Sequence, residues 1–119
     1  MTKRRIEALK EKVIKEKEEY TKEILSLSKE EIVDKAYDIT TIEEFFLWFT
    51  EGGINHMMEH TEAKGEIFRK LEDTPNLLVT LQEKEREYDI PMSHDWENIE
   101  EFIKNFVIDT KDFADDYED

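Results

Sequence analysis

Apolar residues recur at helical spacing along most of this chain. In the first 27 residues they stand three, four or seven positions apart, and Lys and Glu fill most of the positions between them. Side chains at these spacings lie on one face of an α-helix, so the segment predicts one long amphipathic helix. Glu16 and Glu23 interrupt its apolar face, which is formed by Ile6, Leu9, Val13, Tyr20, Ile24 and Leu27.

A capping box predicts the start of a second helix at Ser28. The hydroxyl of Ser28 can accept a hydrogen bond from the amide of Glu31, and the Glu31 carboxylate can accept one from the amide of Ser28. The residues that we expect this helix to bury are Ile32, Val33, Ala36 and Tyr37.

The same pattern recurs at Thr41 and predicts a third helix over residues 42–51. A break at residues 38–41 separates it from the second helix. Gly52 and Gly53 end the third helix, because glycine adopts the left-handed backbone of a C-terminal cap with the least strain.

Three signals organise the rest of the chain. Residues 54–73 have helical spacing with a polar stretch at residues 61–65, so we expect either one helix or two shorter ones. Pro75 marks the next helix, over residues 75–88, because its fixed backbone angle suits the first helical position. Asp95 can cap a last helix, whose apolar face is formed by Trp96, Ile99, Phe102, Ile103, Phe106 and Val107.

The fold class that follows is all-α. The 119 residues include three Gly and two Pro and few alternating β-branched runs, which disfavours sheet. We expect a small single-domain bundle of about five to six helices over residues 1–108, with a long N-terminal helix. An acidic tail over residues 109–119 follows, and we expect it to be loose until a partner binds it.

Charge changes this picture most. The chain has 32 Asp and Glu against 17 Lys and Arg, a net charge of −15. The excess is segregated, since residues 1–25 hold eight basic and six acidic residues, whereas residues 83–119 hold four basic and fourteen acidic ones. Such a surface repels nucleic acid and membranes and attracts basic proteins. We therefore expect a basic protein surface as partner, with no direct contact to nucleic acid or membrane.

The chain contains no Cys, which excludes disulfides, thiolate metal sites and cysteine nucleophiles. No stretch resembles the apolar core of a signal peptide or approaches the ~18 apolar residues of a membrane span. These observations favour a cytoplasmic location.

His56, Glu59 and His60 match the H-x-x-E-H pattern of a group of zinc peptidases. The two imidazoles lie one helical turn apart, which is the spacing that zinc needs. Such a peptidase also needs a distant third ligand and a larger domain. We therefore interpret the histidines as surface residues, and we expect the protein to have no enzymatic activity and no cofactor. Metal binding through His56 and His60 is the weaker alternative.

Residues 45–49 are five consecutive large apolar residues, which extend more than once around a helix. One interpretation is a central helix that the bundle encloses. The other is an interface with a partner or a second copy of the chain, formed by Phe46, Trp48 and Phe49.

The acidic C-terminal third suggests a nucleic-acid mimic. Carboxylates along a helix can approach the charge density of duplex DNA and occupy a groove that evolved for phosphates. Tail aromatics could stack in such a groove. The candidate partner-binding residues are Glu97, Glu100, Glu101, Asp109, Asp112, Asp115, Asp116, Glu118 and Asp119.

Several short stretches carry a resemblance to known proteins: Glu19-Tyr20, Ile24-Leu25-Ser26-Leu27, Glu30-Glu31-Ile32, Ala36-Tyr37, Thr41-Ile42-Glu43-Glu44, Pro75, Leu77 or Leu78, and Glu83 to Glu87. They resemble a family of small uncharacterised helical proteins of Gram-positive bacteria and their mobile elements. That resemblance implies no catalytic residues. In size and charge the chain is similar to acidic inhibitors of the anti-CRISPR and antirestriction type.

The function that these observations predict is a non-enzymatic inhibitor that binds a basic groove of a nucleic-acid-handling protein, such as a CRISPR effector or a restriction enzyme, as a DNA or RNA mimic. The alternative is a small helical scaffolding module that dimerises through residues 45–49.

Overall fold

The computed structural model describes the backbone of residues 3–59, 64–87 and 95–118, and the side chains of these residues except 64 and 108–118. Within these ranges the chain forms seven helices and no strand, which confirms the all-α fold class. The helices are α1 (Lys3–Leu25), α2 (Lys29–Asp34), α3 (Ala36–Thr50), α4 (Gly53–Glu59), α5 (Lys64–Asp73), α6 (Leu77–Arg86) and α7 (Trp96–Glu118). The segment predicted as one helix or two is therefore two helices, α4 and α5.

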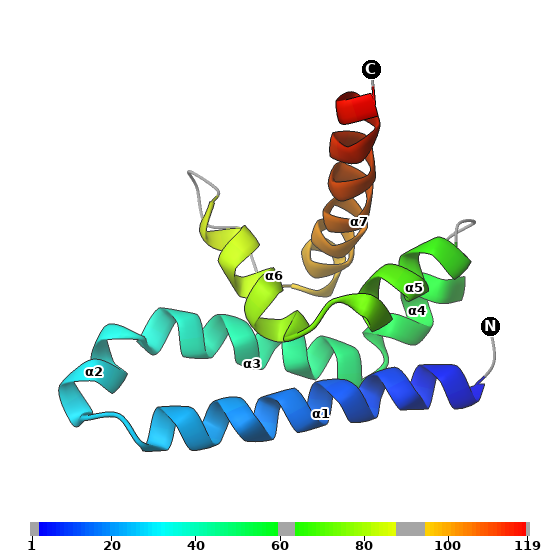
Figure 1. Ribbon diagram of the computed structural model, residues 1–119. Coiled ribbons are helices and arrows are strands. Elements are labelled where there is room, and N and C mark those ends of the chain that lie inside the picture. Colours follow the sequence, from blue (N-terminus) through cyan, green and yellow to red (C-terminus); the bar gives the residue numbers. More distant parts are fainter. Residues whose placement is uncertain (1–2, 60–63, 88–94, 119) are drawn as a thin grey trace.

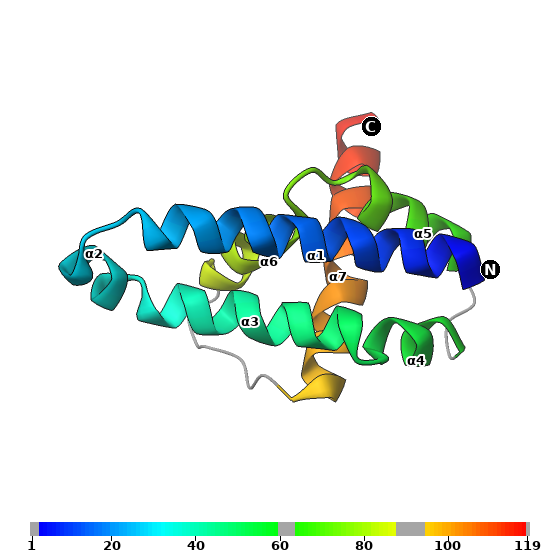
Figure 2. The same ribbon diagram turned by 90° about the horizontal axis from the view of Figure 1, so that it is seen from below.

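Helix α3 lies at the centre of the bundle, where it contacts α1, α2, α4, α6 and α7. Figure 2 shows α1 and α3 side by side, with α2 joining them at one end and α4 following α3 at the other. Figure 1 shows α6 and α7 on one side of this pair, and the C-terminal half of α7 stands away from the other helices.

The aromatic run of α3 belongs mainly to the core. Phe45, Trp48 and Phe49 are at most 1% exposed. The Trp48 and Phe49 rings meet edge to face with centroids 5.0 Å apart, and Phe45 lies 5.5 Å from Phe102 of α7. Trp48 and Phe49 are therefore not available as interface anchors, and the prediction that assigned them this role is wrong. At these positions α3 is the enclosed central helix of the first interpretation. Phe46 differs, because it is half-buried and the Lys17 ammonium lies 5.4 Å from its ring centroid.

The two glycines that follow α3 have different roles. Gly52 has a φ of +110°, a backbone conformation that side chains other than glycine rarely adopt, so it ends α3 as predicted. A Cβ atom on Gly53 would overlap the indole of Trp48. Gly53 is thus required by close packing against the core.

The predicted break at residues 38–41 is wrong. The chain breaks at Lys35, and α3 continues from Ala36 through Thr41, whose side chain is buried inside the bundle. Asp38 explains the earlier start, because its carboxylate accepts hydrogen bonds from Gln82 at 3.0 Å and Arg86 at 3.4 Å. The hydrogen-bonding capacity of Asp38, the polar residue that suggested a break, is thus satisfied by side chains of α6.

The capping box at Ser28 is confirmed. The Glu31 amide donates to the Ser28 hydroxyl and the Ser28 amide donates to the Glu31 carboxylate, both at 3.2 Å. The expected burial of this helix is wrong, since α2 buries no residue, Ile32 is half-buried and Ala36 is exposed. Of the described helices, α4, α5, α6 and α7 do not extend over this end of the molecule (Figure 1).

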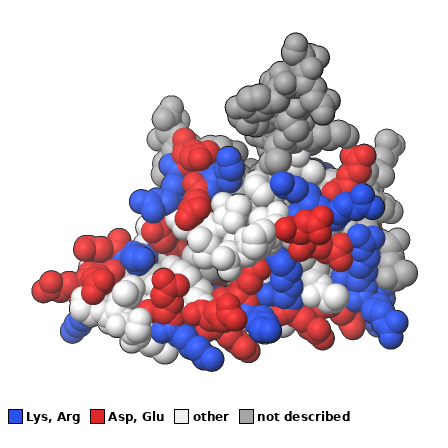
Figure 3. Space-filling view, viewed as in Figure 1, with Lys and Arg blue, Asp and Glu red and all other residues white. Residues whose placement is uncertain are grey.

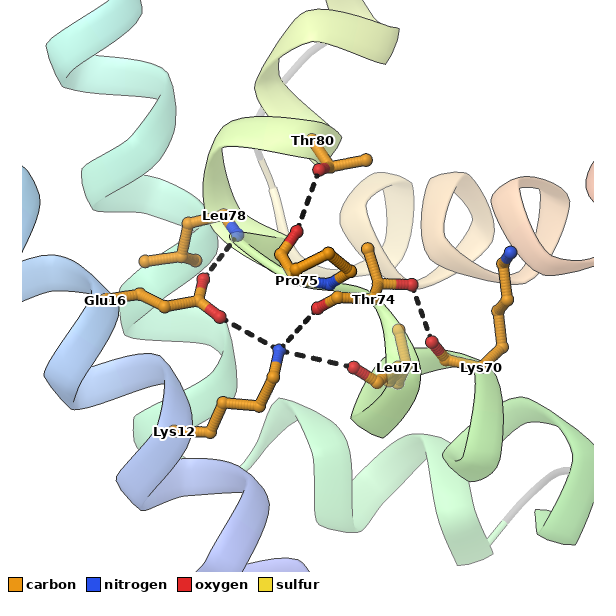
Figure 4. Close-up of polar contacts among 8 residues, drawn as sticks. All are labelled: Lys12, Glu16, Lys70, Leu71, Thr74, Pro75, Leu78 and Thr80. Carbon is orange, nitrogen blue, oxygen red and sulfur yellow. Dashed lines mark hydrogen bonds and ion pairs between the residues drawn. The ribbon is translucent and has the colours of Figure 1, made fainter.

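The turn between α5 and α6 is held by two charged residues of α1 (Figure 4). Glu16 accepts a hydrogen bond from the Leu78 amide at 2.9 Å, and Lys12 donates to the Thr74 carbonyl at 2.7 Å. Lys12 and Glu16 are also 2.9 Å apart as an ion pair. The carboxylate thus satisfies an amide at the positive end of α6, and the ammonium lies near the negative end of α5.

The predicted helix start at Pro75 is consequently shifted. The Thr74 hydroxyl donates to the Lys70 carbonyl at 2.6 Å, so it belongs to the end of α5 and does not cap the following helix. Asn76 adopts a left-handed backbone with a φ of +50°, and α6 begins at Leu77. Glu16, which interrupts the apolar pattern of α1, supplies the cap from another helix.

Candidate protein-binding surface

Helix α7 contains most of the predicted partner-binding carboxylates, and its first half is anchored in the core. Asp95 caps its first turn as predicted, because the Asn98 amide donates to the Asp95 carboxylate at 2.9 Å. Five apolar side chains of its first half are buried, namely Ile99, Phe102, Ile103, Phe106 and Val107. The Lys70 ammonium lies 5.8 Å from the centroid of the Phe106 ring. This packing fixes the direction in which the rest of α7 leaves the bundle.

The three predicted carboxylates of the first half differ in their surroundings. Glu97 and Glu101 are exposed and lie one helical turn apart. Glu100 has a side chain only 15% exposed, and its carboxylate lies 3.2 Å from the His56 imidazole of α4. Glu97 and Glu101 are therefore accessible to a partner, whereas Glu100 joins α7 to α4.

The second half of α7 contains most of the remaining candidates. Its backbone is helical as far as Glu118, through the segment that was expected to be a loose tail. The side chains of Asp109, Asp112, Asp115, Asp116 and Glu118, and the whole of Asp119, lie outside the described residues. The division of the chain at residue 108 stays a prediction. At the helical rise of 1.5 Å per residue, residues 108–118 span about 16 Å.

Positive and negative side chains are mixed on the face shown in Figure 3. Several basic groups of the described residues form ion pairs across helices, including Arg5 with Glu72 at 2.7 Å and Lys17 with Glu43 at 2.8 Å. This face is not the uniform acidic surface that a nucleic-acid mimic needs. The acidic residues that the sequence concentrates near its C-terminal end therefore make α7 the candidate for a mimic surface.

A buried carboxylate lies between α3 and α6. Glu85 is 2% exposed and accepts a hydrogen bond from the Tyr37 hydroxyl at 2.8 Å. This hydrogen bond is the main cause that raises the pKa of Tyr37, and burial and the negative charge of Glu85 add to it. Sequence reasoning missed the pair, although Glu85 follows Leu78 and Leu81 on the apolar face of α6.

The histidine motif is only partly described. His56 lies on α4 beside Glu100, and Glu59 is exposed on the same helix, whereas His60 lies outside the described residues. Among the residues that the structure does describe, no group of three His, Asp or Glu side chains could hold a metal ion. His56 is placed to make a contact between helices.

A cavity of about 390 Å³ lies between α1 and α4. Two Lys and two Glu lie among its lining residues, so its charge is balanced and favours neither an anion nor a cation. The lining residues are Lys3, Ile6, Glu7, Lys10, Asn55, Met58 and Glu59.

Comparison with models of known protein families gave no match, and comparisons with curated proteins and with solved structures gave none either. The resemblances noted in the sequence therefore stay untested. Of the helices in the described ranges, none has the length and apolar character needed to cross a membrane.

Proposed function

We propose that this chain is a non-enzymatic protein that inserts its acidic helix α7 into a basic groove of a nucleic-acid-handling protein and inhibits it by competing with DNA or RNA. One observation carries the proposal. The first half of α7 is anchored in the core, while the second half stands away from the bundle (Figure 1). This second half contains most of residues 109–119, which hold six acidic residues and one basic one.

Charge spacing supports this role. One strand of a duplex carries a negative charge every ~3.4 Å along its axis, or about five charges over the ~16 Å that eleven helical residues span. The eleven helical residues 108–118 include five acidic residues, which matches that density. A groove lined by Lys and Arg for one nucleic-acid strand can therefore accept a helix of this charge.

The partners that suit this chemistry are restriction enzymes and CRISPR effectors, because both hold nucleic acid in basic grooves. In this proposal the chain acts in the cytoplasm and binds neither nucleic acid nor membranes directly. Steering by opposite charges would make association fast and strongly dependent on salt. The scaffolding alternative loses its support from Trp48 and Phe49, which are buried.

Retention of bacterial proteins on the immobilised chain tests the proposal. We expect nucleic-acid-handling proteins to bind at about 0.05 M NaCl, to elute before about 0.5 M, and to be displaced by excess DNA. Asp115→Lys with Asp116→Lys should release them at lower salt. The matched control, Glu7→Lys with Glu11→Lys, makes the same charge change on α1 and should have little effect.

Two results would overturn the proposal. One is binding that persists unchanged at high salt and in excess DNA. The other is an equal loss of binding in the α7 and α1 variants, because that would reflect net charge alone. Melting curves of both variants check that the bundle stays folded.

A further inference from the structure

The end of the molecule where α1, α2 and α3 meet exposes apolar side chains. Leu25 at the end of α1 is 76% exposed, and Val33 of α2 is 66% exposed. Figure 1 shows that this end projects beyond α6, on the side opposite α4 and α5. We call it the tip surface and define it by Tyr20, Ile24 and Leu25 of α1, Val33 of α2 and Ile39 of α3.

A groove of about 180 Å³ runs into the tip surface between α1 and α3. Apolar side chains form most of its lining, and the cationic group of Lys17 at its edge is paired with Glu43 at 2.8 Å. The groove has room for one large apolar side chain. Its lining residues are Lys17, Tyr20, Thr21, Ile24, Leu25 and Ile39.

The surroundings of the groove are acidic. Residues 18–38 hold seven acidic residues against three basic ones, and most of the carboxylates are exposed. The Tyr20 hydroxyl lies in this negative field: burial raises its pKa most, and the charges of Asp38 and Glu23 raise it further. An occupant should therefore combine an apolar side chain with positive charges beside it.

A second copy of this chain does not meet that requirement. Each copy has a net charge of −15 and would present the same acidic rim, so two tip surfaces would repel each other. An amphipathic helix with Lys or Arg along its flanks offers the complementary arrangement, because one apolar face can enter the groove while its charges meet the rim.

We propose that the tip surface binds an amphipathic helix of another protein, with an apolar side chain in the groove and basic residues facing the acidic rim. This site is separate from the projecting half of α7, and it does not depend on the function proposed for that helix. With both surfaces occupied, the chain would hold two binding elements at once.

A labelled synthetic helix of Leu and Lys in an amphipathic pattern serves as the probe, and fluorescence anisotropy measures its binding to the full chain. Leu25→Gln with Val33→Gln should weaken binding about tenfold or more, because it removes apolar contacts and leaves the net charge unchanged. The matched control is Ile14→Gln, on α1 outside the tip surface, where the side chain is 40% exposed. It should change binding by less than about twofold.

Further measurements separate the tip surface from other sites. A Leu and Glu peptide of the same pattern should not bind, and Asp115→Lys with Asp116→Lys should leave binding of the Leu and Lys peptide nearly unchanged. Equal binding to the wild type and the tip variant would overturn the proposal. So would loss of binding only in the α7 variant, or a dimer in sedimentation experiments that disappears in the tip variant. Melting temperatures confirm that each variant is folded.

Discussion

At the scale of single residues, Glu16 and Lys12 join three helices through two charged groups. The Glu16 carboxylate accepts the Leu78 amide hydrogen bond, and the Lys12 ammonium donates to the Thr74 carbonyl. Both groups face helix ends where backbone partners are missing. Their side chains are 13% and 28% exposed, so water competes only partly for these contacts.

We expect Glu16→Ala to lower the free energy of unfolding by about 1 to 2 kcal/mol, because it removes a charged cap from α6. Glu16→Gln keeps an acceptor and should cost less. Urea denaturation measures both changes. Glu18→Ala is the control, since Glu18 is exposed on the same helix and its removal should cost about 0.5 kcal/mol or less. Equal losses for Glu16→Ala and Glu18→Ala would contradict the capping role.

At the scale of helices, α3 and α6 are joined by polar contacts as well as by the core. The Tyr37 hydroxyl donates to Glu85, and Asp38 accepts from Gln82 and Arg86. Because the hydrogen bond to Glu85 needs the protonated hydroxyl, it raises the pKa of Tyr37 above the ordinary 10.0. Its contribution to stability is therefore full below pH 10.0 and is lost as the pH rises through the raised pKa.

The change Tyr37→Phe should lower the stability of the chain at neutral pH and reduce its further loss above pH 10.0. Denaturation curves across the alkaline range measure the two slopes, and ultraviolet titration follows the hydroxyl directly. An identical alkaline slope in wild type and variant would show that the contact between Tyr37 and Glu85 does not contribute.

Local signals predicted some helix boundaries well. The Ser28 capping box, the Asp95 cap and the end of α3 at Gly52 each depend on residues a few positions apart, and all are confirmed. The failures at Asp38 and Pro75 have a different cause. There the partners lie 44 to 62 positions away in the chain, and helical periodicity carries no information about such contacts.

The same distinction between local and long-range contacts applies to the candidate surface. Helical spacing places Glu97 and Glu101 one turn apart on α7, and both are exposed. It does not predict the contact between Glu100 and His56, which requires knowing how α4 and α7 pack. It also does not predict the tip surface. The spacing of apolar residues in α2 indicates burial, and only the tertiary structure shows that α6 and α7 do not extend over α2.

At the scale of the whole molecule, repulsion among carboxylates opposes the fold. A net charge of −15 on 119 residues favours expanded states, while ion pairs such as Arg5 with Glu72 oppose expansion locally. Exposed ion pairs contribute about 1 kcal/mol or less each, so the overall repulsion should dominate the response to salt.

Raising NaCl from about 0.02 M to about 0.5 M should therefore raise the melting temperature of the free chain by several degrees, because screening weakens the repulsion. The same salt should dissociate a complex held by opposite charges. Thermal melts of the free chain measure the first effect. A melting temperature that falls with added salt would show that the ion pairs contribute more to stability than the repulsion costs.

The reach of α1 also determines an order of folding events. Three of its charged residues, Arg5, Lys12 and Glu16, meet partners 59 to 67 positions further along the chain, between Leu71 and Leu78. Closing loops of that length is entropically costly and comes after local helix formation. During synthesis the charged residues of α1 therefore have no partners until α5 and α6 have been made. Helix α3 is made earlier and can already cover the apolar face of α1. The turn between α5 and α6 closes late, and weakening it should accelerate unfolding more than it slows folding.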